Sequence, residues 1–223
     1  MLEVRGIGSV MAKTALQFAR YNSLSVQPLC PYITGYIKKH PETQDLLKKG
    51  FVLGVKNRKM QKIALIAAMS ENRVIGINNR LPWTLPKDWE NFRRVTKGKA
   101  YLMGRMSYIT EDALISSYRN VILTSKEDLV LSDQCERAGS LEEAFQLLEN
   151  EKEYFILGGA SVYEQTMDKG NYLYLTIVHA TVEGDAYFPE INWEKWELVE
   201  SVRYEADERH AYAFSLNEYI KKA

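Results

Sequence analysis

The stretch Lys62-Ile63-Ala64-Leu65-Ile66-Ala67-Ala68-Met69 decides the class of fold. Its nearly continuous run of apolar side chains predicts a strand that is buried on both faces, as in a parallel sheet. A loop rich in Asn and Gly follows over residues 72–79, and another apolar run, Ala100-Tyr101-Leu102-Met103, comes after the next predicted helix. Because this order of strand, loop, helix and strand repeats, we predict an α/β fold with a mostly parallel central sheet and helices on both faces.

A second informative stretch is Leu81-Pro82-Trp83-Thr84-Leu85-Pro86-Lys87-Asp88. Proline is tolerated in a first helical turn, so a helix is predicted to begin at Pro86. Apolar residues then recur at helical spacing on one face: Trp89, Phe92 and Val95. Asp88 lies beside that face, near the positive end of the helix dipole. An isolated Asp here is commonly only a helix-start charge, but its place beside an apolar wall makes it a candidate acid.

The C-terminal part predicts three further strands, over residues 172–178, 196–199 and 211–216, where the sequence is apolar or alternating. We expect the last two to form an antiparallel hairpin at the edge of the sheet. His179 and His210 stand at strand ends without the spacing of metal ligands. They are expected to be surface or turn residues, and no metal site is predicted.

The composition is that of an ordinary globular protein. The 223 residues carry a formal net charge of zero, which does not indicate a nucleic-acid or membrane surface. Two cysteines, Cys30 and Cys135, lie far apart and are expected to be free thiols, as in a reducing compartment. No apolar stretch could span a bilayer, and the N-terminus lacks the apolar core of a secretion signal. We therefore expect a cytoplasmic protein.

Several motifs occur together in one order and with one set of spacings. They are residues 63–79, Leu-Pro-Trp-x-Leu-Pro-x-Asp at 81–88, Met-Gly-Arg at 103–105, residues 120–125, Ile-Leu-Gly-Gly-Ala-x-Val-Tyr at 156–163 and Val-Glu-Gly-Asp at 182–185. In this combination, residues 62–221 resemble dihydrofolate reductase, and we expect residues 62–223 to form one domain of that kind. The resemblance implies a monomer that acts in one-carbon metabolism and belongs to a class of enzyme that antifolates target. Such an enzyme uses NADPH to reduce 7,8-dihydrofolate to 5,6,7,8-tetrahydrofolate.

The resemblance also implies roles for the residues around Asp88. Its carboxylate would bind the pterin and assist protonation of N5, and partial burial should raise its pKa. Trp83 would hold a water near the acid through its single N–H, whereas composition alone favours a role in core packing. Leu81 would lie with Asn79 and Gly76 in a mobile loop that closes over the nicotinamide. Asp185 either holds that loop closed or is an ordinary turn aspartate.

The remaining site residues follow from two glycine turns and from the resemblance. Each turn follows an apolar run and precedes a predicted helix, so it offers backbone donors to a diphosphate. The substrate would contact Ile66, Ala67, Asp88, Phe92, Leu157 and Thr176. NADPH would contact Ala68, Ile75, Gly76, Gly104, Arg105, Met106, Ser107, Leu123, Thr124, Ser125, Gly158, Gly159, Ala160, Ser161, Val162 and Tyr163. The family carries a cis peptide at the Gly158-Gly159 position.

Two departures from the family pattern bear on specificity. Tyr118 stands where the family usually has an Arg that pairs with the glutamate carboxylate of folate, and Arg119 should face the other way. A lost pair of this kind costs about 1.5 to 3 kcal/mol in binding. We therefore expect weaker dihydrofolate binding than usual, unless Arg119, Arg93 or Arg94 substitutes. Ser161 replaces a basic residue and weakens the expected preference for NADPH over NADH. A related pteridine or riboflavin-pathway reductase, or a nucleotide-binding protein without activity, are the alternatives.

The first fifty residues lie outside that resemblance. They are similar to the C-terminal half of a small N-acetyltransferase domain, in which Gly6 and Gly8 match the turn that cradles acetyl-CoA and a helix follows over residues 10–21. The family's opening strands would precede Met1. We therefore expect residues 1–50 to be a short α/β remnant or docking element, and the basic segment 51–61 to be a linker.

Overall fold

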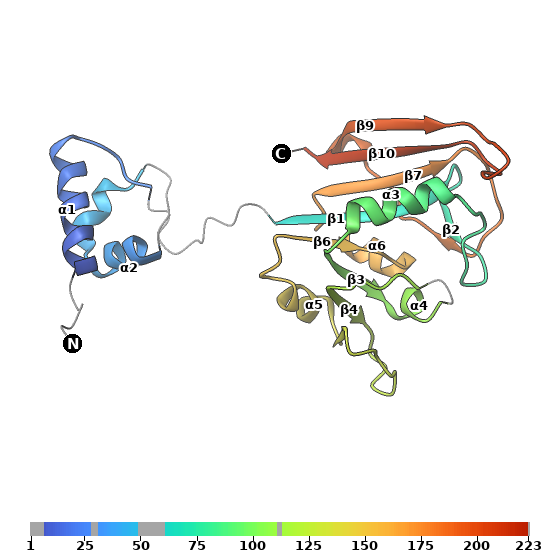
Figure 1. The fold of residues 1–223 in the computed structure, drawn as a ribbon, viewed down its shortest axis with the longest axis horizontal. Coiled ribbons are helices and arrows are strands. Elements are labelled where there is room, and N and C mark those ends of the chain that lie inside the picture. Colours follow the sequence, from blue (N-terminus) through green and yellow to red (C-terminus); the bar gives the residue numbers. More distant parts are fainter. Residues whose placement is uncertain (1–6, 28–30, 49–60, 111–112, 223) are drawn as a thin grey trace. The chain divides into compact units, whose positions relative to one another are not determined.

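The computed structural model describes residues 7–27, 31–48, 61–110 and 113–222 (Figure 1). The chain divides into two compact units, Met1–Lys59 and Met60–Ala223. The expected linker lies outside the described residues apart from Gln61, as do Gly6 and Cys30. Each unit is described by itself.

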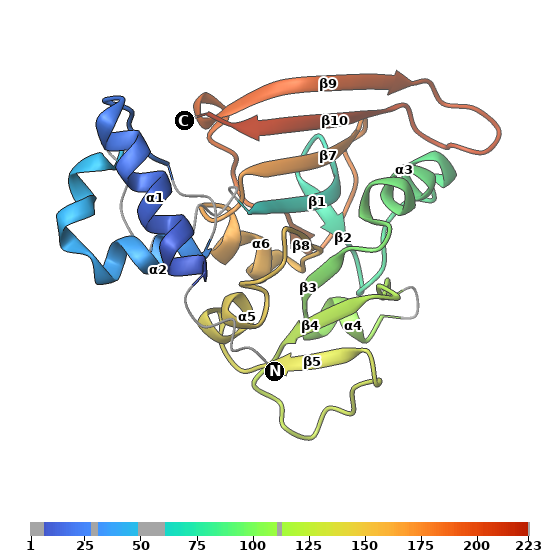
Figure 2. The same cartoon turned by 60° about the vertical axis from the view of Figure 1, so that its left-hand side comes forward.

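An eight-stranded sheet forms the centre of the larger unit, in the order β5-β4-β3-β6-β1-β7-β10-β9 (Figure 2). The strands are β1 (Lys62–Ser70), β3 (Ala100–Gly104), β4 (Arg119–Leu123), β5 (Cys135–Ala138), β6 (Glu153–Ile156), β7 (Tyr172–Val178), β9 (Trp196–Tyr204) and β10 (Phe214–Lys221). Strands from β5 to β7 pair in parallel, whereas β10 pairs antiparallel with both β7 and β9. The predicted parallel sheet with an antiparallel edge hairpin is confirmed, although β10 begins later than the sequence suggested.

Helices cover both faces of this sheet because β1 is apolar on both sides. The helices are α3 (Pro86–Thr96), α4 (Arg105–Tyr108), α5 (Leu141–Leu147) and α6 (Ala160–Thr166), with a short 3-10 helix η2 (Trp193–Lys195). Ile66 of β1 packs in one core cluster with Phe92 of α3. The preceding residue of the strand, Leu65, packs in a second cluster with Ala144 of α5 and Val162 of α6. No helix among the described residues has the length and apolar character that crossing a membrane would require.

The segment expected to be only a loop, residues 72–79, contains a short strand. Strand β2 (Val74–Gly76) pairs antiparallel with β8 (Ala186–Tyr187). A Cβ atom at Gly184 would lie 2.2 Å from Cγ1 of Val74, so glycine is needed for this close approach. The pairing joins residues more than a hundred positions apart, and a local sequence pattern does not carry that information.

The smaller unit is helical in its described part. It contains α1 (Ile7–Tyr21), α2 (Pro31–Lys39) and the 3-10 helix η1 (Pro41–Leu46), with a core of Leu16, Ile37 and Leu46. Its only described β contact is an isolated parallel bridge between Val26 and Leu47. Helix α1 begins at Ile7, so Gly8 lies inside the helix and not in a turn before it, which corrects the expected helix start.

Candidate active site

A cavity of about 1040 Å³ opens at the carboxyl ends of the parallel strands of the larger unit. This is the edge of an open α/β sheet where ligands commonly bind. Leu81, Asp88 and every predicted substrate and cofactor residue except Gly158 line the cavity. Of the predicted catalytic residues, Trp83 alone does not line it. The cavity therefore brings together residues that the sequence distributes over about a hundred positions.

Asp88 is the buried acid of the cavity wall. It sits in the first turn of α3, where Pro86 begins the helix. The hydroxyl of Thr176 on the neighbouring strand β7 donates a hydrogen bond to Oδ1 of Asp88 at 2.5 Å. Burial raises the pKa of the Asp88 carboxyl, and the hydrogen bond from Thr176 opposes this shift only in part. A carboxyl in this setting can hold a proton at a higher pH than an exposed aspartate can.

Trp83 lies behind the cavity wall in a core cluster with Leu85, Val178 and Phe214. Among the described residues, its indole Nε1 is the buried side-chain nitrogen or oxygen that lacks a hydrogen-bond partner in the protein. A buried donor without a partner costs free energy, so this N–H is suited to a bound water or ligand.

The loop after β2 reaches the edge of the cavity. Asn78 and Asn79 adopt left-handed conformations with φ of 49° and 61°, which suits asparagine. The backbone N–H of Asn78 donates to Oδ2 of Asp185 at 2.9 Å, and the N–H of Asp185 donates to the carbonyl of Gly76 at 3.1 Å. Asp185 thus connects the two loops that the sequence singled out, and Leu81 lies partly exposed beside them.

The two glycine turns meet in space. The N–H of Gly104, before α4, donates to the carbonyl of Gly158, before α6, at 2.6 Å. The peptide between Gly158 and Gly159 is cis, as the resemblance implied. Gly158 has a φ of +93°, and a Cβ there would lie 2.6 Å from the ring of Tyr163. The Tyr163 hydroxyl in turn donates to the carbonyl of Ile66 at 2.6 Å, so this turn is packed directly against β1.

A third turn at the cavity was missed by the sequence reading. It comprises the start of α5, where Ser140 accepts the N–H of Glu143 at 3.2 Å and Glu143 accepts the N–H of Gly139 at 2.8 Å. The pair resembles a capping box, except that Glu143 accepts the N–H of the residue before the N-cap, and the Ser-x-x-Glu pattern after a strand was the signal available. Lys126, next to the predicted Thr124 and Ser125, also lines the cavity and was missed.

Comparison with known proteins identifies the family. The sequence profile described as "Dihydrofolate reductase" matches residues 62–221. The chain belongs to the dihydrofolate reductase family. Dihydrofolate reductases from Staphylococcus haemolyticus and Bacillus subtilis are 38% and 34% identical to it over 158 and 160 residues. These matches cover 71% and 72% of this chain and 95% of each relative.

The fold comparison agrees with this. A dihydrofolate reductase from Enterococcus faecalis, solved in complex with NADP(H) and RAB-propyl, superposes with a TM-score of 0.67 at 30% identity. The match covers 73% of this chain and 97% of that one. Residues 1–46 match a separate profile described as "GCN5-related N-acetyl-transferase".

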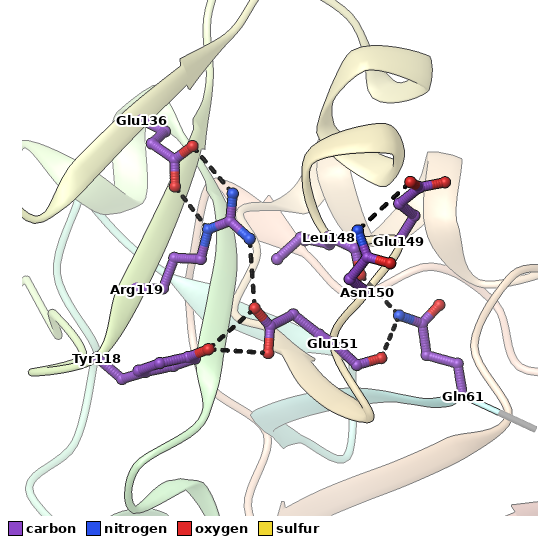
Figure 3. Close-up of polar contacts among 8 residues, drawn as sticks. All are labelled: Gln61, Tyr118, Arg119, Glu136, Leu148, Glu149, Asn150 and Glu151. Atoms are coloured by element: carbon purple, nitrogen blue, oxygen red, sulfur yellow. Dashed lines mark hydrogen bonds and ion pairs between the residues drawn. The ribbon is translucent and has the colours of Figure 1, made fainter. Parts of the chain in front are cut away.

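In this member of the family, the position expected to hold a substrate carboxylate is occupied by a closed polar cluster (Figure 3). Arg119 donates to Glu136 from Nε at 2.5 Å and from Nη2 at 3.0 Å, and to Glu151 from Nη1 at 3.3 Å. The Tyr118 hydroxyl donates to Oε1 of Glu151 at 3.2 Å, and the Gln61 amide donates to the Glu151 carbonyl at 2.7 Å.

Neither Tyr118 nor Arg119 lines the cavity. Arg119 is held by two carboxylates, so it does not replace the missing arginine. The two arginines of α3, Arg93 and Arg94, do not replace the missing arginine either, because neither lines the cavity. Arg94 donates to Asn91 at 2.8 Å. The cations among the described lining residues are Arg80, Arg105 and Lys126.

Proposed function

We propose that this protein is an NADPH-dependent enzyme that reduces 7,8-dihydrofolate to 5,6,7,8-tetrahydrofolate. The observation that carries the proposal is the buried carboxyl of Asp88, with its raised pKa, in one cavity with two glycine turns at strand ends. Membership of the family supports the reaction, and the NADP(H) bound to the Enterococcus faecalis relative supports the cofactor.

The reaction needs a hydride at pterin C6 and a proton at N5. NADPH supplies the hydride from C4 of its nicotinamide. We assign to Asp88 the binding of the pterin amino group and ring nitrogen, which orients the ring and favours protonation of N5. Thr176 holds the Asp88 carboxyl in place, and Phe92 packs against the benzoyl ring of the substrate. Ile66, Ala67 and Leu157 complete the apolar wall.

Two further residues act on this step. We propose that the Trp83 N–H donates to a water next to the acid, because this buried donor has no partner among the described residues. We propose that Leu81, which lies in the loop joined to Asp185, excludes bulk water when that loop closes.

The cofactor cradle combines backbone donors with two cations. Gly104 and Gly159 allow the backbone to approach a diphosphate closely, and Thr124 and Ser125 offer hydroxyl groups. Arg105 and Lys126 also line the cavity and supply positive charge. Ser161 carries no positive charge. We therefore propose that Lys126 selects NADPH over NADH.

The setting of the enzyme is also proposed. Its neutral net charge and the free thiol of Cys135 support a cytoplasmic monomer without a nucleic-acid partner. Residues 51–61 would tether the reductase to residues 1–50, which we propose to be a remnant or docking element without acetyl-transfer activity.

The test is consumption of NADPH by the purified chain in the presence of dihydrofolate, followed by absorbance. Steady turnover that is lost in Asp88→Asn supports both the reaction and the role of the acid. Binding of NADPH without turnover contradicts the proposal and leaves another pteridine, a riboflavin-pathway substrate or a non-catalytic nucleotide-binding role.

A further inference from the structure

Helix α3, which carries Asp88, lacks a cap of its own. The residue before it is Leu85, whose side chain accepts no hydrogen bond. Pro86 has no N–H to satisfy, so the N–H of Lys87 is the first backbone donor of the helix. At most helix starts a Ser, Thr, Asp or Asn side chain accepts such a donor. Here the local sequence supplies none.

A histidine from the far end of the chain fills this role. Nε2 of His210 accepts the Lys87 N–H at 3.2 Å, across a sequence separation of 123 residues. His210 lies in the connection between β9 and β10, and its side chain is only 9% exposed. Its ring packs against Phe214 of β10, with the centroids 5.4 Å apart. The residue expected at a surface or turn is therefore a buried turn residue beside the catalytic helix.

Asp207 fixes which nitrogen of His210 carries the proton. Oδ1 of Asp207 lies 2.7 Å from Nδ1 of His210 and also accepts the backbone N–H groups of Arg209 and His210, each at 2.8 Å. These hydrogen bonds lower the pKa of the Asp207 carboxyl. An ionised Asp207 accepts a hydrogen bond from the Nδ1–H of His210, which leaves the lone pair of Nε2 free to accept the Lys87 N–H.

We propose that His210 is a positioning residue that caps α3 from outside and thereby holds Asp88 against the substrate. Only the neutral ring can do this, because an imidazolium would direct a second N–H at the N–H of Lys87. The cap itself follows from the structure, whereas its effect on catalysis rests on the proposed function.

Other charged and titratable groups surround this contact. Glu90 of α3 interacts electrostatically with His210, and Arg209 of the same connection interacts with Lys87 and Glu90. Tyr204, at the end of β9, interacts with Lys87. Glu90 is paired with Lys87 at 2.9 Å. Asp207 is the carboxylate that the ring contacts directly, so protonation of the ring would strengthen that contact while it breaks the one to Lys87.

The test compares two variants of the full chain. His210→Phe keeps an aromatic ring against Phe214 but removes the acceptor, whereas His210→Gln keeps an acceptor oxygen and does not titrate. We expect His210→Phe to raise the KM for dihydrofolate about five- to tenfold, the size of a lost cap, without changing the Kd for NADPH. His210→Gln should stay within about threefold of the parent.

Amide exchange of Lys87, followed by NMR without any substrate, tests the cap independently of the reaction. Exchange should accelerate about fivefold or more in His210→Phe and much less in His210→Gln. Unchanged exchange in His210→Phe overturns the cap whatever the enzyme reduces. Faster exchange with an unchanged KM overturns the positioning role, and a parent without turnover means that the proposed function has failed while the cap stands.

Discussion

At the scale of single residues, the proposed reaction depends most on the carboxyl of Asp88. Asp88→Asn should keep the side-chain shape and the hydrogen bond from Thr176 but remove the group that favours the proton at N5. We expect kcat with dihydrofolate to fall about 100-fold or more, measured by steady-state NADPH consumption. Asp133→Asn, the same change at an exposed position, is the matched control and should leave kcat unchanged. Comparable losses in both variants would contradict the role of Asp88.

The same substitution should stabilise the fold near neutral pH. Burial raises the pKa of Asp88 in the folded state, so the folded protein holds its proton more tightly than the unfolded chain does. The free energy of unfolding of the parent should therefore fall as the pH rises from about 3.9, the ordinary value, through the raised pKa. Asn does not ionise, so the free energy of unfolding of Asp88→Asn should not show this fall. Urea unfolding should show a more stable variant at about pH 7 and a gap that closes toward about pH 4.

Tyr118 is expected to limit the affinity for the folate tail. Tyr118→Arg should lower the KM for dihydrofolate about tenfold by restoring a charge-assisted pair. Glu151 would compete for the new guanidinium, because it already accepts from Tyr118 and Arg119. The effect should therefore be larger in Tyr118→Arg combined with Glu151→Gln. Tyr118→Phe, which adds no charge, is the control, and an unchanged KM in the double variant would contradict the expectation.

At the scale of elements, the glycine turn before α6 should tolerate little change. An alanine at Gly158 would need a φ near +93° and would place Cβ 2.6 Å from the Tyr163 ring. We expect Gly158→Ala to lower the Tm by several degrees and to weaken NADPH binding about tenfold, because Tyr163 and its bond to β1 must shift. At Gly139 the nearest atom to an added Cβ is Glu143 Oε2, at 3.5 Å. Gly139→Ala should therefore change the Tm much less, and equal losses of Tm would contradict the steric explanation.

Elements with a strong local pattern were predictable, and those set by distant contacts were not. The apolar run predicted the bounds of β1 within about one residue, and the proline predicted the first residue of α3. The ribbon of β2 and β8 escaped prediction because its register depends on Gly184 packing against Val74. The role of His210 also escaped prediction, because its contact with Lys87 spans 123 residues and no local pattern indicates it. Most of the predicted site residues line one cavity. Their choice rested on several family motifs that agree, and their individual roles stay predictions.

At the scale of the whole molecule, the two units differ in how well they bury their apolar surface. The larger unit contains every described residue that lines the cavity. In the smaller unit, α1 buries Ala12, Leu16 and Ala19 but leaves other large side chains exposed. Met11 is 67% exposed and Phe18 is 64% exposed. The core in the described part of this unit is small, which supports its proposed role as a remnant or docking element.

Removal of the smaller unit should leave the reductase intact. We expect residues 60–223 alone to fold and to retain kcat/KM for dihydrofolate within about twofold of the full chain, because the sheet and both helical layers lie within that range. The full chain should also show no heat of binding with acetyl-CoA in a titration that readily detects NADPH. Loss of activity in residues 60–223, with a circular dichroism spectrum that still shows a folded protein, would contradict this independence. That result would mean that the N-terminal unit contributes directly to the proposed active site.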